Sequence, residues 1–103
     1  MADPMRIRAQ MQGDKAVVRV LMSHEMETGQ RRDAAGRLVP AWFIQDVTVS
    51  LNGKAVLTVE WGPAIAKNPF LQLNVKGAKV GDKITVLWKD NKNDTRTDEA
   101  TVS

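Results

Sequence analysis

Few residues in this sequence have the chemistry of a catalyst, and their spacing does not suit one. His24 is the only histidine, and cysteine is absent. A serine–histidine relay would have to use Ser23, but neighbouring residues on an extended segment point to opposite sides. Paired carboxylates such as Glu25 and Glu27 are typical of solvated loops. We therefore expect no nucleophile and base to act together, and predict that the protein is not an enzyme.

The residues best suited to hold a metal ion alternate along one segment. On an extended chain Met22, His24 and Met26 share a face, and two thioethers with an imidazole suit Cu(I). In a purely structural interpretation, Met22 ends a core strand, Met26 holds the next loop against the fold, and His24 lies at the rim. We favour the structural interpretation and expect no cofactor and no metal. A periplasmic copper-binding β-sandwich is the alternative function.

The charge pattern argues against nucleic acid and membrane partners. Lys and Arg number 15 against 12 Asp and Glu, a net charge of +3. The longest nearly apolar run, 38–44, is interrupted by Pro40 and is far shorter than the roughly 20 residues that span a bilayer. Residues 1–12 lack the apolar stretch of a signal peptide. The densest basic groups fall in predicted loops without adjacent aromatic residues for base stacking; they are Arg31, Arg32 and Arg37, and Lys76, Lys79 and Lys83.

Alternation of apolar and polar residues predicts seven short strands and no helix. The pattern fails between Ser23 and Pro40, which indicates a long irregular loop, and such loops are often functional. Seven alternating strands in 103 residues predict one all-β domain, 1–103, with an immunoglobulin-like sandwich of antiparallel strands and no disulfide. The predicted strands are 5–12, 16–22, 42–51, 55–59, 71–76, 84–89 and a last one that ends near Val102.

The Asn52-Gly53 pair predicts a hairpin turn. A two-residue turn in regular register would place Leu57 on the opposite face from Val49. We therefore predict a three-residue connection with Gly53 in the left-handed region. Val47, Val49, Leu57 and Val59 would then share one buried face.

The aromatic residues gather near the ends of the predicted strands. Trp42 and Phe43 are consecutive, so in a regular strand they face opposite sides and one of them must leave the interior. Trp61 precedes Gly62, and Phe70 follows Pro69. Aromatic side chains on an outer face are common interface anchors. Core filling and partner binding remain equally open for this group.

Five segments and one further residue together resemble the SoxZ family over essentially the whole chain. They are RIRA (6–9), HEMETG (24–29), PAWFI (40–44), NPFL (68–71) and GDKI (81–84), with Trp88. The resemblance implies an immunoglobulin-like β-sandwich, in agreement with the strand count. It also implies the non-catalytic subunit of a sulfur-carrier heterodimer in thiosulfate oxidation.

In that family the partner, SoxY, carries sulfur intermediates on a cysteine in a C-terminal Gly-Gly-Cys-Gly-Gly segment, and other pathway enzymes dock transiently. The resemblance further implies a periplasmic location by export together with SoxY, which would supply the signal peptide. The absence of cysteine from this chain fits that division of labour. For partner binding we select motif and aromatic residues at element ends: His24, Glu25, Arg31, Arg32, Trp42, Phe43, Trp61 and Phe70.

Overall fold

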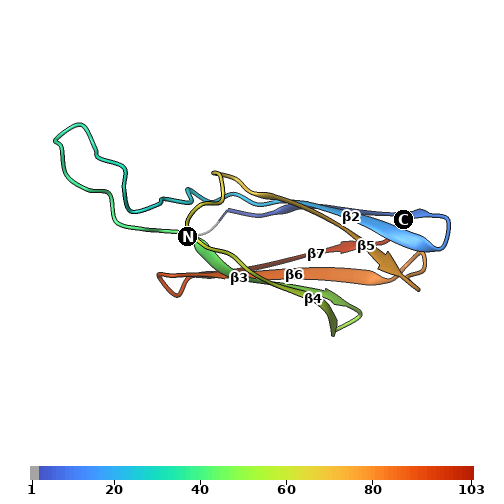
Figure 1. Ribbon diagram of the computed structural model, residues 1–103. Helices are drawn as coiled ribbons and strands as arrows, with labels where there is room; N and C mark the ends of the chain where they lie inside the picture. The colour runs from blue at the N-terminus through green and yellow to red at the C-terminus, as the bar shows by residue number, and fades with distance from the viewer. Residues whose placement is uncertain (1–2) are drawn as a thin grey trace.

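The computed structural model describes residues 3–103, which form seven strands in two packed sheets (Figure 1). The alternating sequence pattern accounts for the strands, and the predicted immunoglobulin-like β-sandwich is confirmed. Among the described residues no helix is long and apolar enough to cross a membrane. The strands are β1 (Arg6–Gln12), β2 (Lys15–Leu21), β3 (Ile44–Leu51), β4 (Lys54–Glu60), β5 (Phe70–Lys76), β6 (Lys83–Asp90) and β7 (Thr95–Thr101).

All strand pairs are antiparallel, and the strand order is β1-β2-β5 in one sheet and β4-β3-β6-β7 in the other. The fourth strand therefore stays beside the third. In a constant-type immunoglobulin domain the fourth strand lies beside the fifth. The difference follows from the tight hairpin at Asn52-Gly53, which returns β4 directly along β3.

The inward-facing residues of both sheets form one hydrophobic core. Every second residue of β2 from Ala16 to Val20, and of β6 from Ile84 to Trp88, is buried. The two sheets close over these side chains, and each buried valine or isoleucine contributes roughly 1.5–3 kcal/mol. The core thus fixes the register of both central strands, and with it the ends from which the loops leave.

The β3–β4 hairpin corrects one prediction. Leu51 pairs with Lys54, so the connection has only two residues, Asn52 and Gly53, both with positive φ. The predicted face still forms, because the register shifts between Val49 and Ser50 and pairs Val49 with Leu57. Val56 is the extra residue of a β-bulge, which supplies the offset that we assigned to the turn.

Candidate functional site

The irregular segment between β2 and β3 protrudes from one end of the sandwich (Figure 1). We call residues 27–42 the protruding loop. Antiparallel bridges join Glu27 to Trp42 and Arg32 to Leu38, so its two legs run side by side. Residues 31–38 are all exposed, and Leu38 at the tip retains 55% of its accessible surface. The loop is therefore an ordered projection whose tip presents apolar and basic side chains to solvent.

A cluster of three side chains, with His24 and Asp90 buried and Trp42 partly buried, holds the base of the loop. The Asp90 carboxylate, at the end of β6, accepts hydrogen bonds through Oδ2 from His24 Nε2 at 3.1 Å and from Trp42 Nε1 at 2.8 Å. Asp90 has no exposed surface. His24 lies three residues before the protruding loop and Trp42 is its last residue, so one carboxylate ties both ends of the loop to the four-stranded sheet.

The second oxygen of Asp90 organises the turn that follows β6. Oδ1 accepts the backbone N–H groups of Lys92 and Asp94, each at 2.9 Å. Burial by itself raises the pKa of Asp90, but the hydrogen bonds from His24, Trp42 and these two backbone groups outweigh it and hold the pKa below its ordinary value. The carboxylate is therefore ionised at neutral pH and fully hydrogen-bonded.

Acid is expected to weaken the fold through Asp90. Its pKa is lowered from 3.8 in the folded state, so ionised Asp90 stabilises the native chain above that value, and the contribution is lost as the pH falls below it. Thermal unfolding followed from neutral pH to pH 2 should show a steeper loss of Tm for the wild type than for Asp90→Asn. Parallel curves would contradict this prediction.

Asn91 and Gly29 also contribute to the packing at the base of the protruding loop. The Asn91 side chain accepts the Phe43 N–H and donates to the Ala41 carbonyl, both at 2.8 Å. Gly29 has φ +87, and a Cβ at that position would lie 3.1 Å from the Ala41 Cβ. The legs of the loop can approach each other this closely because residue 29 has no side chain.

Gly29→Ala is expected to destabilise the protein more than Gly36→Ala. Both glycines have positive φ, which costs an alanine about 1 kcal/mol, but a Cβ on Gly36 meets nothing within 4 Å. The crowding against Ala41 adds a second cost of about 1 kcal/mol at Gly29 only. Urea unfolding measures both variants, and equal losses would show that the close approach at Gly29 carries no energy.

In the copper alternative the ligands are Met22, His24 and Met26, and the donor atoms of His24 and Met26 are already used in hydrogen bonds. His24 Nδ1 accepts the Met26 backbone N–H at 3.0 Å, and Nε2 bonds Asp90. The Met26 sulfur accepts the Ile44 N–H at 3.3 Å. His24 is also 7% exposed rather than at the rim, and Met22 is completely buried. Two of the three donor groups are therefore engaged within the fold, and the structural interpretation describes the three residues with one correction, the burial of His24.

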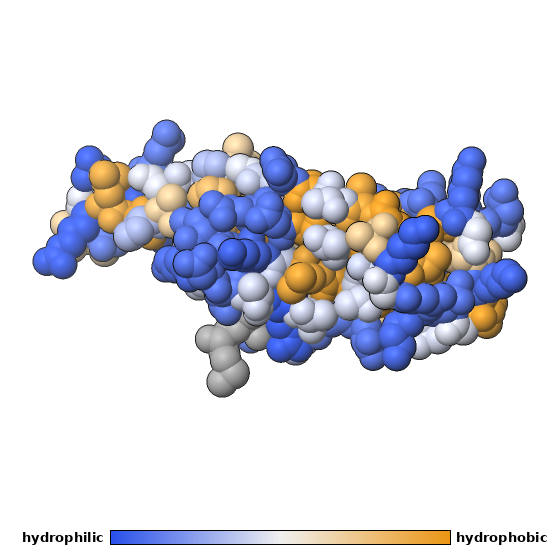
Figure 2. Space-filling model, turned by 90° about the horizontal axis from the view of Figure 1, so that it is seen from below, coloured by the Kyte–Doolittle hydropathy of each residue, from blue (hydrophilic) through white to orange (hydrophobic). Residues whose placement is uncertain are grey.

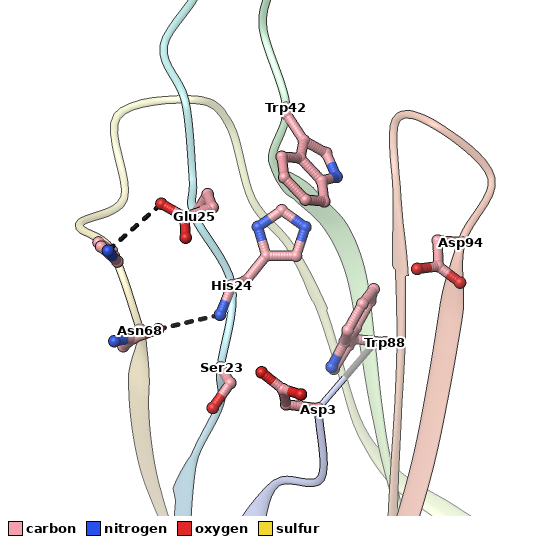
Figure 3. A pocket seen from close by; sticks show the side chains of 9 residues that line it. Asp3, Ser23, His24, Glu25, Trp42, Asn68, Trp88 and Asp94 are labelled. Atoms are coloured by element: carbon pink, nitrogen blue, oxygen red, sulfur yellow. Dashed lines mark hydrogen bonds and ion pairs between the residues drawn. The ribbon is translucent and has the colours of Figure 1, made fainter. Parts of the chain in front are cut away.

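A small cavity opens beside His24 (Figure 3). The imidazole makes edge contacts with the Trp42 and Trp88 rings, with centroids 5.0 and 5.2 Å away. Within residues 3–103 the buried Trp88 Nε1 has no hydrogen-bond acceptor. The cavity has a volume of about 320 Å³ and is lined by Asp3, Ser23, His24, Glu25, Trp42, Lys67, Asn68, Trp88 and Asp94.

A second hollow lies against the protruding loop itself. Its volume is about 570 Å³, and it separates the first leg of the loop from the 64–67 segment. Ion pairs border it: Arg31 binds Glu27 at 2.8 Å, and Lys67 binds Glu25 at 3.3 Å. The bidentate Arg31 contact lowers the pKa of Glu27. The hollow is therefore a concave surface with charged borders beside the first leg of the loop.

The residues that we selected for partner binding fall in three places. His24 and Trp42 form the base cluster, while Glu25, Arg31 and Arg32 lie along the protruding loop and the hollow. Phe43 and Trp61 pack against the hydrophobic core. Phe70 is 57% exposed on the outer face of the other sheet.

Sequence reasoning missed Asp90, Asn91 and Leu38. Asp90 and Asn91 lie in what reads as an ordinary polar turn, and only the fold brings them to residues 48–66 positions away. The residues next to Asp90 in the sequence do not reveal its burial, because its side-chain partners, His24 and Trp42, lie far away along the chain. Leu38 was noted only as part of an apolar run; its exposure at the tip is a property of the folded loop.

Seven antiparallel strands in two sheets, with one ordered loop projecting from the end, define an immunoglobulin-like β-sandwich with a braced loop. The model of the SoxZ family, described as sulphur oxidation protein SoxZ, matches residues 5–101. The chain belongs to the SoxZ family and is a sulfur-oxidation protein of the Sox system.

Solved structures share the fold at low sequence identity. A superoxide reductase in the oxidized state superposes with a TM-score of 0.68 at 17% identity, covering 99% of this chain and 89% of that one. A hypothetical protein from Pyrococcus horikoshii OT3 gives 0.65 at 19% identity with coverage of 99% and 89%. A superoxide reductase (neelaredoxin) from Ignicoccus hospitalis gives 0.62 at 15%, with coverage of 99% and 80%. No curated protein matches the sequence at a significant level. These likenesses concern the fold alone.

Proposed function

We propose that this chain is the non-catalytic subunit of a SoxYZ sulfur-carrier heterodimer in thiosulfate oxidation. It binds SoxY, whose C-terminal cysteine carries the sulfur intermediates. The observation that carries the proposal is the family match over residues 5–101. The absence of cysteine supports it, because this chain cannot itself hold a persulfide.

The geometry around His24 supports a non-catalytic role. His24 bonds Asp90 through one nitrogen and the Met26 N–H through the other. Neither nitrogen is available to take a proton from Ser23, so the adjacent serine has no base within this arrangement. The three residues hold a loop in place, and the chemistry of the pathway belongs to other proteins.

The protruding loop is the SoxY-binding element in this proposal. A braced loop with an exposed apolar tip loses little conformational entropy when it binds. Arg31 and Arg32 flank the tip, and the hollow behind the loop provides a concave surface for a partner segment. Docking at this end of the molecule leaves the outer faces of both sheets accessible to other proteins.

Titration calorimetry of the purified chain into purified SoxY tests the proposal. We expect saturable one-to-one binding, co-elution on gel filtration and no turnover of thiosulfate by this chain alone. An absence of binding heat together with separate elution would overturn the heterodimer. Turnover by the isolated chain would overturn the non-catalytic role.

The proposed location is the periplasm, reached by export together with SoxY. Fractionation of cells that express this chain with intact SoxY, or with SoxY lacking its signal peptide, tests the location. We expect the chain in the periplasmic fraction only in the first case. An equal distribution in both strains would contradict joint export.

A further inference from the structure

The outer face of the sheet β1-β2-β5 carries only positive charge. Strand pairing aligns the outward residues of the three strands in four rows, which contain basic, amide and apolar side chains and no carboxylate. The basic residues are Arg6, Arg8, Lys15, Arg19 and Lys76. The whole chain has a net charge of +3. The positive charge of this one face is larger than that, so the rest of the chain has a net negative charge. The basic residues are scattered along the sequence but not in space.

Like charges lie directly opposite each other on this basic face. Arg8 pairs with Arg19, and Lys15 pairs with Lys76. Such cross-strand pairs destabilise a sheet by a few tenths of a kcal/mol or more. The ion pairs of residues 3–103 use other cations, so none of the five basic residues of this face is ion-paired within the described chain. Carboxylates from another molecule would relieve their repulsion.

The outer face of the other sheet, β4-β3-β6-β7, mixes polar and apolar side chains and is not uniformly charged (Figure 2). Seen from below, the surface mixes blue, white and orange. Strand pairing places Leu87, which is 41% exposed, between Thr48 and Thr97. The charges of this face have both signs, and Lys83 pairs with Glu99 at 3.6 Å. The uniform charge is therefore a property of one sheet face and not of the protein surface in general.

Three features of the basic face fit a protein partner better than a nucleic acid. Leu21 and Phe70 lie opposite each other at one end, 40% and 57% exposed, and form an apolar contact beside Arg6. Single-strand binders interleave aromatic residues with their cations, whereas Phe70 stands alone at the edge of this face. The amides between the cations can donate hydrogen bonds to carboxylates and backbone carbonyls.

The size of the face indicates a transient contact. Its four rows of three outward residues are fewer than the roughly 20–30 residues that each side of a stable interface contributes. Small charged interfaces gain mainly in association rate and specificity. A carrier that must be released after each step would need this kind of contact.

We propose that the basic face of β1-β2-β5 docks an acidic protein surface on an enzyme that acts on the carried sulfur cargo. The inference rests on the proposed function because it takes the partner to be another protein of the same pathway. The docking site is separate from the protruding loop, so the chain could hold SoxY and present this face at the same time.

The test uses the purified complex of this chain with SoxY and each purified enzyme that loads, oxidises or hydrolyses the cargo. Arg8→Glu/Arg19→Glu reverses two cations of the face, and Lys54→Glu/Lys89→Glu makes the same change in net charge on the other sheet. We expect the first variant to weaken binding of at least one enzyme by about tenfold or more, and the second to change it little. Wild-type affinity should also fall as salt rises from about 50 to about 200 mM.

Equal effects of the two variants, or no effect of either, would overturn the proposal. Tighter binding of a 20-base-pair DNA duplex or of vesicles with anionic lipid than of any enzyme would also overturn it. The affinity of the wild type and of both variants for SoxY is measured in parallel. Its loss in Arg8→Glu/Arg19→Glu would make this face the SoxY interface and overturn the inference, whereas failure of the wild type to bind SoxY would count against the proposed function instead.

Discussion

Replacing Asp90 with alanine is expected to lower the free energy of unfolding by about 4 kcal/mol. The carboxylate has no exposed surface and accepts hydrogen bonds from His24, Trp42 and two backbone N–H groups. Its removal leaves one buried and three partly buried donors without this acceptor, and an unsatisfied buried donor costs about 1–3 kcal/mol. The base of the protruding loop and the turn after β6 would loosen together, because one side chain holds both.

Two further variants make this expectation sharp. Asp90→Asn keeps one oxygen for the turn but directs an NH₂ group at His24 or Trp42, so about half of the loss is expected. Asp46→Ala, an exposed aspartate on the neighbouring strand, should change stability by less than about 0.5 kcal/mol. Urea unfolding at neutral pH measures all three. A loss at Asp90 no larger than at Asp46 would show that the cluster does not hold the loop.

Alternation along the chain was sufficient to predict the strands. The central strands β2 and β6 bury every second residue against a single core, and β7 alternates partly buried with exposed residues. The same alternation predicted the shared face of Val47, Val49, Leu57 and Val59. It could not distinguish a longer turn from a bulge, since both restore the same offset. The bulge at Val56 depends on local pairing geometry, which a hydrophobic pattern does not record.

The candidate site was predictable only in part. Motif membership and residue type were sufficient to select His24 and Trp42, which lie at the two ends of the protruding loop. They did not indicate Asp90, the residue at the end of β6 whose carboxylate joins them. Contacts between residues so far apart in the sequence depend on how the strands are arranged in the fold, which a local pattern does not record. The basic face shows the same limit, because each strand contributes one or two cations and only the register places them together.

Replacing Leu38 with aspartate is expected to weaken SoxY binding by about 2 kcal/mol, or roughly 30-fold, without changing the stability of this chain. Leu38 is 55% exposed at the tip of the protruding loop, and its side chain makes little contribution to the core. An apolar group that a partner covers loses its binding energy when it becomes a charge, and the charge is left to be desolvated at the interface.

Val80→Asp provides the matched control for Leu38→Asp. Val80 is 70% exposed in the loop between β5 and β6, at the end of the sandwich opposite the protruding loop (Figure 1). The two substitutions make the same change in charge and polarity, so general electrostatic effects on SoxY would appear in both. If only Leu38→Asp weakens binding in titration calorimetry, the tip of the loop is in contact with SoxY. If Val80→Asp weakens it and Leu38→Asp does not, SoxY binds the opposite end, and the protruding loop has lost its proposed role.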